Sequence, residues 1–264
     1  MLFFGSPNGH QPTHFQFSNT FMSKIDSSYY AAIYFGCSPT DEVIYTDGVF
    51  SDYFIGQSYL WEGQFCKSIV MRNMIFENSI GNQYQSISLN NAQNIELYNI
   101  TLKNITGSEF PQTSFITTNK FPSTSFIIDG VTIEDCSFLA TKLYATYASL
   151  DYFELVNVHF SNVTITSGES LVVLDNIKHL LLKNMTFDNV SNSDTINEGS
   201  AIILLNSLNL NSDVTTEVYE VGLKSIDNLG YHSEANFLTI SKNQFPDQHY
   251  TSTKNNSVQK YPRL

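Results

Sequence analysis

The sequence has little charge, and basic residues are its scarcest kind. Only 14% of its 264 residues are charged, and 13 Lys and Arg stand against 25 Asp and Glu, which leaves a net charge of −12. Nucleic-acid-binding proteins need clustered basic residues to neutralise phosphates. The composition therefore argues against a nucleic-acid partner and disfavours contact with anionic membrane surfaces.

Long apolar runs are also missing. No stretch of 18 apolar residues occurs, so the sequence predicts no transmembrane helix. The first residues, MLFF, have neither a basic region nor a long apolar core, and they do not resemble a signal peptide. We expect the chain to be a segment of a longer secreted precursor.

Cysteine is scarce too, with three residues in the chain. Cys37 and Cys66 are 29 residues apart, about the length of one repeat, so they could pair across neighbouring repeats or remain reduced. Cys136 falls at an apolar position of the repeat and is predicted to be a buried free thiol. Cysteine alone does not decide the compartment.

Asparagine is abundant, with 26 residues, and much of it belongs to one phrase that occurs five times. An Asn or Gly recurs at steps of 26, 31, 27 and 27 residues. A repeat of 20–50 residues is typical of a solenoid. The five copies are VMRNMIFENS (70–79), LYNITLKNI (97–105), IDGVTIEDC (128–136), LVNVHFSNV (155–163) and LKNMTFDNV (182–190).

Apolar residues alternate within each phrase, which indicates strands. The alternation is interrupted at one column, which we call the bend column, consisting of Asn73, Asn99, Gly130, Asn157 and Asn184. Asn and Gly share an ease of adopting a left-handed backbone, so we interpret the column as requiring positive φ rather than a particular side chain. A bent strand every ~27 residues, without helices, predicts an all-β parallel β-helix whose coils stack about 4.8 Å apart.

Stacking predicts three inward columns and a further strand before each phrase. SISL (86–89), YASL (147–150), LVVL (171–174) and AIILL (201–205) are the expected extra strands. We expect about eight coils in one domain over residues 1–243, regular over about 69–210 and degenerate at both ends, followed by a polar tail at 244–264. The columns are Phe76, Leu102, Ile133, Phe160 and Phe187; Met71, Leu97, Ile128, Leu155 and Leu182; and Ser79, Ile105, Cys136, Val163 and Val190.

The bend-Asn phrase and the coil length resemble the right-handed parallel β-helices of the pectin-lyase-like superfamily, over about residues 43–240. The Asn-rich wording most resembles repeats of very large ciliate surface proteins. The resemblance implies a secreted or membrane-anchored parent protein. The carboxylate motifs of the superfamily's polygalacturonases and methylesterases are missing, which weakens an enzymatic interpretation.

One pair of acids remains a candidate site. Asp151 and Asp175 follow Leu150 and Leu174, which we align in one column, so their side chains are expected about 5 Å apart on adjacent coils. Asn90 and Asn206 extend the same column. Such a pair could bind Ca²⁺ or act in glycoside hydrolysis; the simpler alternative is solvated turn residues. Neither a cofactor motif nor a histidine or cysteine metal-ligand spacing is present.

Six N-x-[S/T] sequons could carry N-linked glycans if the chain is secreted. Asn99 and Asn184 lie in the bend column, where stacking between coils is expected to leave no room for a glycan. The better candidates are therefore Asn104, Asn162, Asn189 and Asn255.

Aromatic residues crowd the first quarter of the chain and leave three alternatives open: packing on themselves, contact with a partner, or stacking on sugar rings. They are Tyr29, Tyr30, Tyr34, Tyr53, Tyr59 and Trp61.

The sequence as a whole favours a non-catalytic extracellular or cell-surface module with a structural or interaction role. Its expected partners are axially stacked copies of itself or further segments of the same polypeptide, because β-helix ends expose strand edges. A carbohydrate-active enzyme or a sugar-binding adhesin on the same fold is the alternative.

Overall fold

The computed structural model describes the chain over fourteen stretches. These are residues 2–5, 14–27, 31–56, 59–81, 87–107, 113–118, 123–138, 141–146, 150–165, 172–175, 177–192, 201–206, 215–228 and 236–240. The predicted tail at 244–264 lies outside them.

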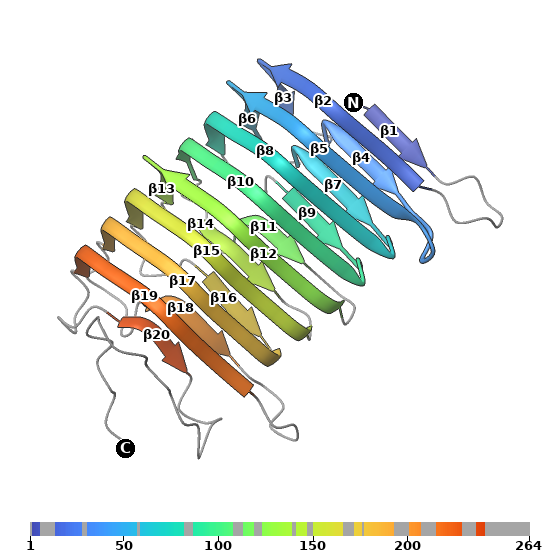
Figure 1. Ribbon diagram of the computed structural model, residues 1–264. Helices are drawn as coiled ribbons and strands as arrows, with labels where there is room; N and C mark the ends of the chain where they lie inside the picture. Colours follow the sequence, from blue (N-terminus) through green and yellow to red (C-terminus); the bar gives the residue numbers. More distant parts are fainter. Residues whose placement is uncertain are drawn as a thin grey trace.

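The described residues form strands and no helix, and neighbouring strands are parallel throughout. Figure 1 shows them stacked in chain order, from β1 and β2 at one end to β19 and β20 at the other. The predicted parallel β-solenoid is confirmed. The regular repeat makes about five turns. The predicted eight coils included degenerate coils at both ends, where further strands continue the stack.

Each coil contributes one long strand and one short strand to two stacked sheets. The long sheet runs in the order β19, β17, β15, β12, β10, β8, β5, β2. Its members are β2 (His14–Ser23), β5 (Glu42–Ser51), β8 (Ser68–Gly81), β10 (Asn94–Thr106), β12 (Ser123–Glu134), β15 (Leu150–Ile165), β17 (Ile177–Asn192) and β19 (Thr215–Asn228). Three two-residue strands, β3 (Asp26–Ser27), β6 (Phe54–Ile55) and β13 (Ser137–Phe138), pair at its border.

The short sheet forms the second wall of the tube. It contains β1 (Leu2–Gly5), β4 (Ile33–Gly36), β7 (Trp61–Gln64), β9 (Ile87–Asn90), β11 (Thr113–Thr118), β14 (Thr141–Thr146), β16 (Val172–Asp175), β18 (Ala201–Asn206) and β20 (Asn236–Ile240). Of the strand predicted at 147–150, residues 147–149 lie outside the described residues, and Leu150 begins the long strand β15. The short strand of this coil is β14, which ends at Thr146.

Two left-handed residues bend each regular long strand. At the bend column, φ is 53° at Asn73, 53° at Asn99, 75° at Gly130, 55° at Asn157 and 48° at Asn184, so the predicted positive φ is confirmed. A second left-handed corner lies five residues further on, at Asn78, Asn104, Asp135, Asn162 and Asn189. Each corner turns the strand without breaking the register of the coils.

The three predicted inward columns are in register and form the core. Phe160 lies opposite Ile133 on one neighbouring coil and Phe187 on the other, and all three are at most 1% exposed. The rings of Phe160 and Phe187 stack with their centroids 4.6 Å apart. The members of the other two columns are also buried, including the polar Ser79.

Two inward glycines make room for large side chains in the first coils. A methyl group on Gly63 would lie 2.7 Å from Cζ3 of Trp61, and one on Gly48 would lie 2.4 Å from Cε of Met74. Trp61 is fully buried. The indole ring of Trp61 therefore fits only because Gly63, two residues further along the same strand, has no side chain.

Candidate functional site

Side-chain amides form a hydrogen-bonded ladder along the bend column, which we call the first ladder. Asn99 donates from Nδ2 to Oδ1 of Asn73 over 2.9 Å, and Asn73 donates to Asp47 over 2.8 Å. Beyond Gly130 the ladder restarts, because Asn157 donates to Oδ1 of Asp129 over 2.6 Å and Asn184 donates to Asn157 over 2.6 Å. A carboxylate can only accept, so an aspartate begins each run.

A second ladder follows the second left-handed corner. Asn104 donates from Nδ2 to Asn78 over 2.9 Å. The next run begins at Asp135, which accepts from Asn162 over 2.9 Å, and Asn162 accepts from Asn189 over 2.9 Å. Both ladders are thus interrupted at the same coil, that of β12, and in both a carboxylate starts the new run.

The asparagines of both ladders are exposed. The expectation that the bend column is partly buried between coils, with no room for a glycan, is therefore wrong. The turn of the backbone at a left-handed residue points the side chain away from the tube, while neighbouring amides still touch along the axis. Asn99 and Asn184 present their amides to solvent in the same way as Asn104, Asn162 and Asn189.

The fold itself explains why sequons recur. In Asn104-Ile105-Thr106 the Asn is a ladder residue, Ile105 is 2% exposed and points into the tube, and Thr106 returns to the outer surface. The same alternation produces N-x-[S/T] at Asn99, Asn162, Asn184 and Asn189. The motif is thus a by-product of the ladder, and the sequons alone do not establish a glycosylated protein. Asn255 lies outside the described residues.

Asp151 and Asp175 do not form the predicted acidic pair. Asp151 is exposed on β15 of the long sheet, whereas Asp175 ends β16 of the short sheet, where its register partner is Asn206. Three residues separate β14 from β15, but one residue separates β16 from β17, so the two Leu-Asp sequences are not equivalent. Asn90 ends another short strand, β9, opposite Gln64. The geometry proposed for Ca²⁺ binding or hydrolysis is absent at these two aspartates.

The cysteines divide into a disulfide and a buried thiol. Cys37 and Cys66 are joined by a disulfide with a Cα–Cα distance of 4.8 Å, linking the corners that follow β4 and β7. Cys136 is 2% exposed and donates to the carbonyl of Glu134 over 3.1 Å. Burial raises the pKa of its thiol to about 11, so it is a poor nucleophile at neutral pH.

Two of the aromatic residues of the first quarter belong to the core. Trp61 and Tyr53 are at most 2% exposed, and Trp61 packs on Phe35 with ring centroids 5.0 Å apart. Packing on themselves therefore accounts for these two. Tyr34 differs, because it lies half-buried on the outer face of β4. Tyr29 and Tyr30 lie outside the described residues.

A polar group surrounds Tyr34 on the outer face of the short sheet. Glu62 is the register partner of Tyr34, and Gln64 is the register partner of Gly36. Gln64 donates from Nε2 to Oε1 of Glu62 over 2.5 Å. Burial raises the pKa of Glu62, opposed by the Gln64 hydrogen bond. Burial, and next to it the Glu62 carboxylate, raise the pKa of Tyr34.

Phe65 follows this group and is unusual in two respects. Its φ is 63°, and its side chain is 46% exposed. A left-handed backbone costs a residue with a bulky side chain about 1–2 kcal/mol, and an exposed ring gains little from burial. The sequence pattern does not reveal Phe65, because this corner does not belong to the repeated phrase.

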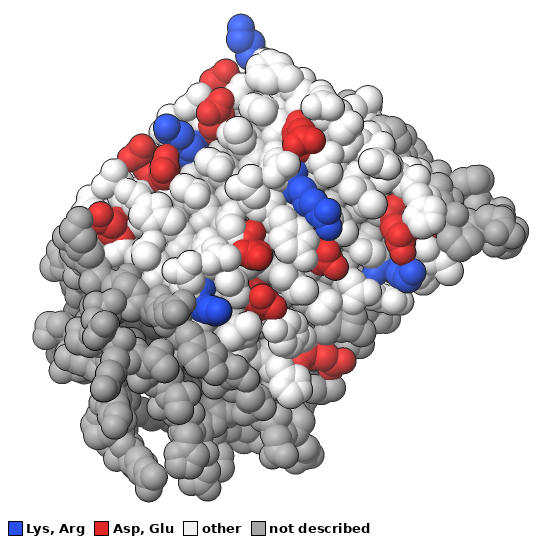
Figure 2. All heavy atoms as spheres, in the orientation of Figure 1, with Lys and Arg blue, Asp and Glu red and all other residues white. Residues whose placement is uncertain are grey.

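Charges of both signs are interspersed over the described part of the outer surface seen in Figure 2, without a field of one sign. Lys67 contacts Glu42 at 2.8 Å, and this hydrogen bond lowers the pKa of Glu42. His159 is exposed, and its Nδ1 lies 2.6 Å from the hydroxyl oxygen of Thr186. These contacts link neighbouring coils.

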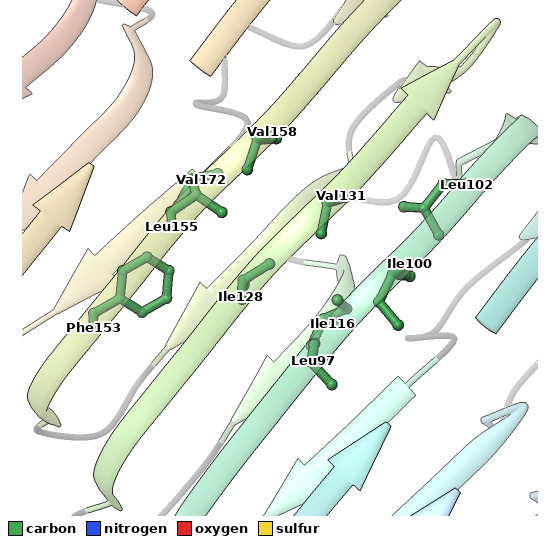
Figure 3. Close-up of a pocket in the computed structure, with 10 residues that line it drawn as sticks. All are labelled: Leu97, Ile100, Leu102, Ile116, Ile128, Val131, Phe153, Leu155, Val158 and Val172. Atoms are coloured by element: carbon green, nitrogen blue, oxygen red, sulfur yellow. The ribbon is translucent and has the colours of Figure 1, made fainter. Parts of the chain in front are cut away.

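A cavity of about 20 Å³ lies inside the tube, where Figure 3 shows apolar side chains from both sheets pointing into it. The cavity lies where the side chains of one inward column are smaller. In that column Ile100, Val131 and Val158 lie between Met74 and Met185. Its lining is wholly apolar, and it offers a ligand no polar contact. The lining residues are Leu97, Ile100, Leu102, Ile116, Ile128, Val131, Phe153, Leu155, Val158 and Val172.

No protein-family model, curated protein or solved structure matches the chain. Within the stretches that the structure describes, no three His, Cys, Asp or Glu side chains gather as a metal site. Over the same stretches, no helix of the length and apolarity needed to span a membrane is found.

Proposed function

We propose that this chain is a structural or interaction module of an extracellular or cell-surface protein, a right-handed β-helix of the pectin-lyase-like kind that joins axially to further coils. The further coils would come from a second copy or from more of the same polypeptide. The state of the end strand β2 carries this proposal, and the disulfide supports the compartment.

The inward side chains of the coil that contains β2 are only partly covered. Phe15, Phe17, Met22 and Ile25 continue the inward columns, yet they are only half-buried. Their neighbours on the next coil, Val43, Tyr45, Phe50 and Tyr53, are at most 2% exposed. Among the described strands, β2 is the edge of the long sheet. An apolar edge strand of this kind readily pairs with another strand.

The disulfide between Cys37 and Cys66 favours an oxidising compartment. Such bonds persist in secreted and surface proteins and are rare in the cytosol. N-linked glycans would fit this location. The ladder asparagines that begin a sequon, and whose exposed amides could carry a glycan, are Asn99, Asn104, Asn162, Asn184 and Asn189. Each of these amides donates one N–H hydrogen to its neighbour in the ladder, so the other is available for the glycan bond.

Analytical ultracentrifugation of the chain tests the axial contact. We expect self-association at tens of micromolar, and we expect Phe15→Lys to reduce it, because a charge would enter the apolar end face. Phe21→Lys is the matched control: Phe21 lies on the same strand and is 68% exposed on the outer surface, so the same added charge should leave association unchanged. Circular dichroism checks that both variants fold.

A soluble monomer at that concentration would contradict the proposed contact. Equal effects of the two substitutions would also contradict it, since they would assign the association to the outer surface.

A further inference from the structure

The backbone at Phe65 is left-handed at a corner where the neighbouring coil has an asparagine. Phe65 follows Gln64 and Asn91 follows Asn90, and these two preceding residues are register partners. Asn91 has φ 60° and Phe65 has φ 63°. Asparagine takes this conformation with little strain, whereas phenylalanine does not. The coil therefore bears a cost at Phe65 that an asparagine would avoid.

The exposed ring of Phe65 is held on a rigid support. Cys66 is tied to Cys37 by the disulfide, and the amide of Cys37 donates to the carbonyl of Gln64 over 3.0 Å. The carbonyl of Cys66 accepts from Gln93 over 3.2 Å. A strained residue with an exposed aromatic side chain on a fixed backbone is a feature that often marks a binding site.

A second aromatic ring and two polar groups lie on the two neighbouring strands, β4 and β7, that lead to this corner. The ring of Tyr34 leans along β4 over Gly36, where a methyl group would lie 3.2 Å from Tyr34 Cε1. Gly36 is the register partner of Gln64, which brings the ring next to the Gln64–Glu62 hydrogen bond. Aromatic, amide and carboxylate groups thus occupy one outer strip of β4 and β7, followed directly by Phe65.

We propose that Tyr34, Glu62, Gln64 and Phe65 form a binding site for a neutral saccharide. Sugar rings combine an apolar C–H face, which packs on aromatic rings, with hydroxyl edges that bond to carboxylate and amide groups. The strip offers both kinds of contact on adjacent strands. The carboxylate of Glu62 disfavours acidic sugars by charge repulsion. This site does not depend on the axial contact proposed above.

The test is an array of neutral oligosaccharides built from glucose, mannose, xylose, galactose or N-acetylglucosamine, with oligogalacturonate as the acidic probe. We expect the native chain to bind at least one neutral probe and not the acidic one. Phe65→Asn should weaken that binding at least tenfold. Because it removes the backbone strain, it should also raise the unfolding temperature by about 2–4 °C.

Phe54→Asn is the matched control, because Phe54 is also a partly exposed phenylalanine but lies on β6, at the border of the long sheet. It should leave binding unchanged. The proposal is overturned if no neutral probe binds, or if Phe65→Asn and Glu62→Gln both bind as the native chain does. Binding of the acidic probe alone would also overturn it. A stabilised Phe65→Asn variant that retains full binding would also overturn the proposal, because the strained ring would then have no role in saccharide binding.

Discussion

The amide of Asn157 donates its ladder hydrogen bond to the carboxylate of Asp129, not to the residue that occupies its own column on that coil, Gly130. Glycine supplies the left-handed backbone of the corner but no side-chain acceptor. The preceding aspartate provides the acceptor, so a new run of the ladder starts on the coil that lacks its asparagine.

This arrangement predicts that Gly130→Asn repairs the ladder. Asparagine tolerates the φ of 75°. A methyl group at this position would lie 3.4 Å from its nearest atom, the backbone nitrogen of Asn99, which is an ordinary contact distance. Asp129→Ala alone should cost about 1 kcal/mol, the value of one hydrogen bond. In the double variant most of this loss should be recovered, as measured by urea unfolding. Additive effects in the cycle would show that the introduced side-chain amide does not take over the acceptor role.

Asn157 tests how much of the corner depends on backbone and how much on side chain. Asn157→Val should lose about 1–3 kcal/mol, because a β-branched residue resists positive φ. Asn157→Gly keeps the backbone but loses two hydrogen bonds, those to Asp129 and Asn184, so it should cost about 1–2 kcal/mol. If the glycine variant is as stable as the native chain, the side-chain hydrogen bonds add nothing to stability, and the corner requires only a residue that adopts positive φ.

The expected cost of Asn157→Gly differs from the sequence interpretation, which assigned the column to positive φ alone. The Asn-for-Gly exchange reveals a backbone requirement, since both residues meet it. The same exchange gives no sign of the side-chain hydrogen bonds, because on the coil of Gly130 the acceptor is Asp129, which belongs to a different column. Sequence periodicity correctly predicted the three inward columns, since alternation within a phrase is local.

The relation between the two sheets was harder to predict. It depends on how many residues lie between the strands, which is one between β16 and β17 but three between β14 and β15. That difference separates Asp151 from Asp175. The left-handed backbone of Phe65 could not be predicted for a related reason. It could be inferred only from alignment with Asn91 on the neighbouring coil, and that alignment requires the register of the short sheet.

The cavity predicts a stabilising substitution. Val158→Ile adds one methyl group to a side chain that lines the empty space, and filling it should stabilise the fold by up to about 1 kcal/mol, by analogy with the cost of Ile→Val changes. Val163→Ile is the control, because Val163 is fully buried in another column and does not line the cavity. There the extra methyl group should destabilise the core. Equal effects at both sites in thermal unfolding would argue against a usable cavity.

Cys136 predicts a loss of stability at alkaline pH. Burial raises its thiol pKa from 9.0 to about 11, so the folded state holds the proton that the unfolded chain releases. The stabilisation is complete below pH 9 and is lost as the pH rises to about 11. Two pKa units correspond to about 2–3 kcal/mol. Over this range the native chain should lose that much more stability than Cys136→Ala, measured by urea unfolding without reductant so that the disulfide stays closed.

The comparison between these two proteins isolates the thiol, because the tyrosines and lysines that also titrate above about pH 9 are common to both. Cys136→Ala leaves a small void and is expected to start from a lower stability at neutral pH. Its stability and that of the native chain should therefore converge as the pH rises. Parallel pH profiles would mean that the thiol ionises as easily in the folded chain as in the unfolded one. In that case alkylation of Cys136 by iodoacetamide at about pH 8 should be fast in the native protein, whereas a buried thiol with a raised pKa should react only after unfolding.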